Sequence, residues 1–246
     1  MTDVAEDGRR RTRTSIVATG VAVLLGLLAF VADSVEGVVG QVMVALVSSA
    51  FAWGSAAFLT GRFAASPRRA AATATGVLVL ATLLYYLLVV FVSRRWSGAY
   101  LDDGTSADLQ GLRSIAIMTA LWLIGAVVAG PTLGLLGYLV RVGGVKRAAL
   151  AAGVTTGFLS GEGWHAVAVV PPWQLLAVSD PHQTEFLLGV VISNLVRIVL
   201  PLVVLAWLVT THRLWREWPA LLVATVSGGA LSALLWHLLD AAENSI

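Results

Sequence analysis

The sequence lacks cysteine and has few charged residues. None of its 246 residues is cysteine, which excludes disulfides, thiolate metal sites and cysteine nucleophiles. Charged residues make up 12% of the chain and hydrophobic residues 58%, whereas a soluble domain carries roughly a quarter charged residues. The mean hydropathy of +0.85 places most of this chain in lipid. We therefore predict an all-α fold, a polytopic transmembrane helix bundle.

Motifs for enzyme chemistry are missing as well. The chain contains no HExxH motif, Walker loop, GxGxxG or GxSxG, which are the patterns typical of zinc, nucleotide and hydrolase chemistry. His165 and His237 are expected toward one face of the membrane with Asp240 nearby, but their spacing is not diagnostic of a metal site. We predict a protein that is not an enzyme and that holds neither a metal nor a cofactor.

Apolar runs of membrane-crossing length recur along the chain. A helix needs about 20 apolar residues to cross a bilayer. The run at 15–31 follows a basic stretch, as in a signal peptide, but the absence of a small-x-small cleavage site before Asp33 favours a first span. We predict about seven spans in a single domain over 15–240, with a disordered cytoplasmic tail at 1–14 and a short C-terminal tail at 241–246. The predicted runs are 15–31, 38–60, 70–93, 114–140, 148–170, 185–210 and 218–239.

Basic residues gather in alternate connections between these runs. One set of connections holds twelve of the Lys and Arg residues and the opposite set holds three, while Arg197 falls inside a run. The positive-inside rule then predicts a cytoplasmic N-terminus and, with an odd number of spans, a C-terminus outside. Membrane topology, rather than a nucleic-acid surface, explains these arginines. The richness in Ala, Val, Leu, Gly and Arg, with Lys146 as the single lysine, indicates a bacterial cytoplasmic (inner) membrane protein.

The fifth run combines a stripe of glycine with ionisable residues. Gly153, Gly157 and Gly161 recur every four residues, so on a helix they form a smooth face on which a second helix packs closely, within the chain or in a homo-oligomer. Glu162 and His165 lie beside this stripe. A carboxylate in a membrane-crossing run is expected to face protein or water and to have a partner.

Arg197 in the sixth run is the predicted partner of Glu162. At 1.5 Å per residue, Glu162 lies roughly 12 Å and Arg197 roughly 18 Å from the outer ends of their runs. The long arginine side chain covers that difference. Asn194 lies three residues before Arg197, on the same helix face. The predicted substrate-binding residues are Glu162, Arg197, Asn194 and His165.

Two functions fit such a centre. In the first, the protein binds or transports a small solute between the fifth and sixth runs, with Glu162 binding a cation or proton and Arg197 an anion. In the second, it is a non-transporting membrane partner, such as an assembly factor, sensor or immunity-type protein, and the ion pair only fixes helix register. Gly130-Pro131 in the fourth run is a candidate for the interrupted helix typical of transporter binding sites, or for a simple packing kink.

Four stretches carry a resemblance to a known family. They are AFAWGSAAFLTGRFAASPRRAAA at 50–72, LLYYLL at 83–88, AGPTLGLLGYLVR at 129–141 and GEGW at 161–164. Together they resemble an uncharacterised family of actinobacterial multi-span membrane proteins, a domain of unknown function. This resemblance implies an integral membrane protein and assigns no site residues. Ala18 and Ala22 also give the AxxxA spacing of the first helix in substrate-binding subunits of energy-coupling factor vitamin transporters, a looser similarity.

Overall fold

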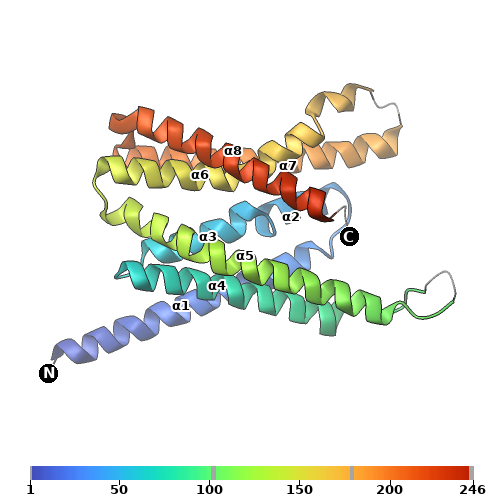
Figure 1. Ribbon diagram of the computed structural model, residues 1–246, viewed down its shortest axis with the longest axis horizontal. Coiled ribbons are helices and arrows are strands. Elements are labelled where there is room, and N and C mark those ends of the chain that lie inside the picture. Colours follow the sequence, from blue (N-terminus) through green and yellow to red (C-terminus); the bar gives the residue numbers. More distant parts are fainter. Residues whose placement is uncertain (1, 101–103, 178–179, 244–246) are drawn as a thin grey trace.

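The chain folds into an elongated bundle of helices, seen in a computed structural model (Figure 1). The structure describes the backbone of residues 2–100, 104–177 and 180–243, and the side chains of residues 15–100, 104–177, 180 and 183–241. The predicted all-α fold is confirmed, since the described residues form helices and no strand beyond an isolated bridge between Tyr100 and Ser106. The helices are α1 (Thr2–Ala32), α2 (Gly37–Val47), α3 (Ala50–Arg62), α4 (Pro67–Leu88), α5 (Asp108–Val142), α6 (Val145–Val169), α7 (Pro181–His212) and α8 (Trp218–Glu243).

Three shorter helical turns complete the elements: the π-turn η1 (Val89–Ser93) and the 3-10 turns η2 (Pro172–Ala177) and η3 (Leu214–Glu217). Helix α6 packs most extensively against α8 and also contacts α7, whereas α4 packs against α5, α1 and α3. Helix α3 contacts α4, α5 and α6, so it joins the two groups. Helix α1 begins and α8 ends at opposite ends of the bundle (Figure 1).

Within the part of the chain that the structure describes, six segments are long and apolar enough to cross a membrane. They are Ser15–Ala32, Gly37–Arg62, Pro67–Ser93, Asp108–Val142, Gln183–His212 and Leu214–Ala241. The seventh predicted run, 148–170, folds as helix α6 but is not among them. Alanine, glycine, serine and threonine make up nearly all of its buried residues. These small side chains allow close packing but contribute little hydropathy, so the helix with the most buried residues is also the least apolar of the predicted spans.

The N-terminal tail differs from its prediction. Residues 2–14, predicted to be disordered, form the first part of helix α1. In the sequence, Glu6 and Asp7 stand four residues before Arg10 and Arg11, which is the acid-before-base spacing that favours a helix. The low hydrophobicity of residues 2–14 predicted disorder, but the segment is nevertheless helical.

The predicted fourth run, which contains Gly130-Pro131, is not interrupted, whereas the second run is. Helix α5 continues through Gly130 and Pro131 without a break. The glycines of α5 serve packing instead, because a Cβ at Gly134 would lie 2.4 Å from the carbonyl oxygen of Ala70 in α4. The second run, 38–60, is the interrupted one, and it divides into α2 and α3 at Ser48 and Ser49.

Candidate functional site

The amino end of α3 lies in the middle of a membrane-length segment. The apolar segment Gly37–Arg62 has 26 residues, and α3 begins within it at Ala50. Ser49 adopts an extended conformation, and its hydroxyl accepts a hydrogen bond from the backbone N–H of Ala52 at 3.4 Å. The first four N–H groups of a helix have no acceptor within the helix and carry the positive end of its dipole. The break therefore places a polar, partly positive helix end where the rest of the segment is apolar.

Glu162 of α6 meets this helix end. Its Oε2 accepts a hydrogen bond from the backbone N–H of Ala50 at 2.8 Å. Its Oε1 lies 3.2 Å from Nε of Arg197 on α7, and the two side chains are only 14% and 20% exposed. The predicted meeting of Glu162 and Arg197 is thus confirmed. The contact with α3 was not predicted, because a backbone amide 112 residues away has no signature in the sequence.

Helix α7 adds a buried amide to the pair. Asn194 is 3% exposed, and its Oδ1 accepts a hydrogen bond from Nη1 of Arg197 at 3.4 Å. Helix α7 approaches α6 closely because residue 163 is glycine: a Cβ there would lie 2.7 Å from Ile198 and 3.0 Å from Arg197. The structure therefore brings Glu162, Arg197 and Asn194 together at one junction of α3, α6 and α7. Their role in binding a substrate stays a prediction.

Several buried polar atoms of α2, of the α2–α3 break and of α7 have no hydrogen-bond partner among the described residues. Nε of Arg197 is one, because its contact with Glu162 is an ion pair without the geometry of a hydrogen bond. The others are Oε1 of Gln41, Oγ of Ser48 and Oγ of Ser193. Gln41 packs against Gly189 of α7. Buried polar atoms normally form hydrogen bonds with protein, water or a ligand. The α2–α7 contact therefore contains unsatisfied hydrogen-bonding groups.

His165 is placed against α8. Its Nδ1 lies 3.6 Å from Oδ2 of Asp240, and the rings of His165 and His237 are 5.8 Å apart between centroids. In the part of the chain that the structure describes, no three histidine, cysteine or acidic side chains are arranged to hold a metal ion. Of the four predicted site residues, His165 therefore belongs to a separate polar contact at the α6–α8 interface.

The glycine stripe of α6 faces α8. A Cβ at Gly157 would lie 2.1 Å from the carbonyl oxygen of Thr225, and one at Gly161 would lie 2.2 Å from Cβ of Ser232. The hydroxyl of Ser232 donates a hydrogen bond to the carbonyl oxygen of Phe158 at 2.8 Å. The predicted close approach of a second helix is therefore confirmed, and the helix belongs to the same chain. The stripe fixes α6 so that Glu162 points away from α8, toward α3 and α7.

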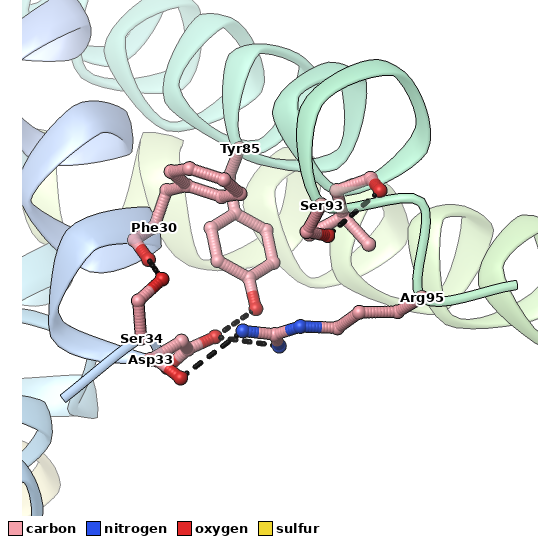
Figure 2. A network of polar contacts seen from close by, with 7 residues as sticks. Phe30, Asp33, Ser34, Tyr85, Ser93 and Arg95 are labelled. Atoms are coloured by element: carbon pink, nitrogen blue, oxygen red, sulfur yellow. Dashed lines mark hydrogen bonds and ion pairs between the residues drawn. The ribbon is translucent and has the colours of Figure 1, made fainter. Parts of the chain in front are cut away.

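A second polar network, which the sequence analysis missed, joins α1 to the end of α4 (Figure 2). The hydroxyl of Tyr85 donates a short hydrogen bond to Asp33. Arg95 donates to the carbonyl oxygen of Asp33 at 3.1 Å and forms an ion pair with its carboxylate at 3.5 Å. These partners lie 52 and 62 residues from Asp33, so no local spacing in the sequence indicates them.

Comparison with known proteins gives the family. A model described as a family of unknown function (DUF6518) matches residues 104–242. The chain belongs to this family. No curated protein and no solved structure gives a significant match. The DUF6518 match extends over α5 to α8, so it includes Glu162, Arg197, Asn194 and His165 and leaves Ala50 outside.

The resemblance noted in the sequence is confirmed in its broader form, that of an uncharacterised family. Two of its four stretches, 129–141 and 161–164, lie within the matched residues. The DUF6518 description assigns no activity, so the site has to be interpreted from its geometry.

Proposed function

We propose that this DUF6518 protein is a multi-pass protein of the bacterial cytoplasmic membrane that binds a small solute, and moves it across the bilayer, at the junction of α3, α6 and α7. One observation carries the proposal. The amino end of a half-helix lies midway along a membrane-length segment and meets an ion pair formed by Glu162 and Arg197.

Three physical features support solute binding. Transporters of several folds place interrupted helices at their binding sites, because the freed backbone groups and the helix dipole hold polar substrates. Ionisable residues inside the membrane are costly and mark functional sites by default. Gln41, Ser48 and Ser193 have buried polar atoms without a hydrogen-bond partner. A solute or its bound water would form hydrogen bonds with these atoms.

The proposal includes an orientation and a seventh crossing. We infer that α6 also crosses the membrane, shielded from lipid by α7, α8 and α5, with which it packs. Seven crossings put the two termini on opposite sides of the membrane. The charge asymmetry then predicts a cytoplasmic N-terminus and an outer C-terminus. The glycine stripe of α6 is occupied by α8, so a homo-oligomer would use another small-residue face. The similarity to vitamin-transporter subunits stays a prediction.

A specific observation favours the second candidate, a membrane partner in which the ion pair is a structural lock. Both carboxylate oxygens of Glu162 already have a partner, Ala50 for one and Arg197 for the other. A lock of this kind would fix the register of α3, α6 and α7 without binding anything. It would still be costly to break, because a buried charge would lose its counter-charge.

Ligand-induced thermal stabilisation separates these two functions. Purified wild-type protein in detergent is screened against panels of cations, organic anions, sugars, amino acids and vitamins, alongside Glu162→Gln. Glu185→Gln serves as the matched control, since Glu185 is an exposed carboxylate at the far end of α7. Solute binding predicts at least one class that raises the melting temperature of wild type and Glu185→Gln by several degrees but not that of Glu162→Gln. If no class stabilises wild type selectively, the protein is not a solute-binding one and the lock interpretation stands.

A further inference from the structure

Two arginines and a histidine meet at the end of the bundle opposite the end of α8. Arg62 closes α3, Arg141 lies in the last turn of α5 and His212 ends α7. All three belong to helix ends on the same side as the start of α1 (Figure 1). Nη2 of Arg62 lies 2.8 Å from Nε2 of His212, and Arg141 donates a hydrogen bond to the carbonyl oxygen of Ala64. Because Ala64 stands two residues after Arg62, this hydrogen bond brings Arg141 to the carboxyl end of α3.

The charge of this cluster is not compensated among the described side chains. A guanidinium only donates hydrogen bonds, so Nε2 of His212 must accept and the imidazole is neutral. Among the described side chains at this end of the bundle, Glu217 in η3 is the acidic one. It forms no ion pair with Arg62 or Arg141. The ion pairs of the described residues involve Asp33, Asp240 and Glu162.

One donor of the cluster is also buried without a partner. Nη1 of Arg62 is shielded from solvent and makes no hydrogen bond to the described residues. The same guanidinium lies 5.6 Å above the ring of Trp207, which holds its plane without satisfying its N–H groups. An unsatisfied donor on a partly buried charge is costly, and an anion that reached it would satisfy it. A basic residue at the carboxyl end of α3 or α5 stabilises the helix dipole, which explains why arginines stand there. That role does not give Nη1 of Arg62 a hydrogen-bond partner.

We propose that Arg62, Arg141 and His212 form a binding site for the phosphate group of an anionic ligand. A guanidinium group matches the oxygens of phosphate through parallel charge-assisted hydrogen bonds, and two arginines lie at this helix end. His212 holds Arg62 in place by accepting from Nη2, while Nη1 stays without a hydrogen-bond partner among the described residues. Basic sites between membrane helices on the side rich in lysine and arginine bind lipid headgroups, and free inorganic phosphate presents the same chemistry. The site is independent of the junction at Glu162.

The experiment has two arms that distinguish these sources. In the first, full-length protein in a neutral detergent is titrated with inorganic phosphate, with sodium chloride of equal ionic strength as the reference, and its melting temperature is followed. In the second, the protein is placed in nanodiscs of phosphatidylcholine containing increasing phosphatidylglycerol, and bound lipid is counted by native mass spectrometry. Wild type is compared with Arg62→Gln, with Arg141→Gln and with the control Arg68→Gln, an exposed arginine at the same end.

The expected result is binding in at least one arm, which identifies the source of the phosphate. Arg62→Gln and Arg141→Gln should then require at least tenfold more phosphate or phosphatidylglycerol than wild type, while Arg68→Gln behaves as wild type. If Arg62→Gln cannot be purified, the exposed Arg141 decides the result alone. The proposal is overturned if wild type binds neither probe above the chloride reference, or if Arg68→Gln weakens binding as much as Arg141→Gln does.

Discussion

At the scale of single residues, the position of Glu162 is determined by two kinds of partner. Arg197 was predictable, because a charge in a membrane segment needs a counter-charge and one hairpin separates the two residues. The backbone N–H of Ala50 was not predictable, because every residue except proline has such a group. The same limit applies to Asp33, whose partners Tyr85 and Arg95 are distant in sequence and of common types.

The first residue-scale prediction concerns the strength of this pair. Replacing Glu162 with alanine leaves Arg197 without a counter-charge and removes the acceptor of Ala50, so we expect the free energy of unfolding to fall by about 3 kcal/mol. Adding Arg197→Ala should cost much less than Arg197→Ala costs alone. The measurement is a double-mutant cycle by reversible denaturation in mixed micelles. Strictly additive losses would show that the two side chains do not stabilise each other.

At the scale of elements, small residues determine which helices approach each other. The four-residue spacing of Gly153, Gly157 and Gly161 predicted a close contact but not its partner, because several other helices also carry small residues. Helix α8 became the partner through Gly229 and Ser232, which leave room for the α6 backbone. Of the two interpretations of Gly130-Pro131, close packing fits the structure and an interrupted helix does not. Helix α5 packs against α4 through glycines, whereas the break lies at Ser48 and Ser49, where Ser49 caps α3 and Glu162 accepts from Ala50.

The element-scale prediction tests the α6–α8 contact. In Gly157→Ala the new Cβ would lie 2.1 Å from the carbonyl oxygen of Thr225 and 2.6 Å from the backbone nitrogen of Gly229. The helices must then separate, and we expect a loss of about 1–3 kcal/mol in unfolding free energy. Gly125→Ala in α5 is the matched control, since its Cβ would have no neighbour within 4 Å. Equal stability of the two variants in a denaturant titration would contradict the packing described for α6.

At the scale of the whole molecule, the distribution of charge could be predicted better than the number of crossings. The connections that hold most of the basic residues lie at the end where α1 begins (Figure 1), because the long helical segments alternate in direction. Among the described residues, six segments are long and apolar enough to cross, whereas the proposed orientation makes α6 a seventh crossing. The hydropathy of α6 is low because small residues, which pack closely against neighbouring helices, make up most of its buried side chains.

The whole-molecule prediction is the location of the connections on either side of α6. A reporter that is active only in the cytoplasm should be active when fused after Gly144 and inactive when fused after Asp180. A reporter that requires export should give the reverse pattern, and a fusion after the final residue should match the fusion after Asp180. The same activity at Gly144 and Asp180 would show that α6 does not cross the membrane.

The hydrogen bond from Ala50 to Glu162 also has a consequence for the timing of assembly. Its two ends are 112 residues apart, and at a synthesis rate of roughly 5–20 residues per second the second residue follows the first by about 6 to 20 seconds. Until then the amino end of α3 has neither its carboxylate nor Arg197. Helices α1 to α5 are therefore made before the break in the second segment can be satisfied, and α6 completes a structure that the earlier helices leave open.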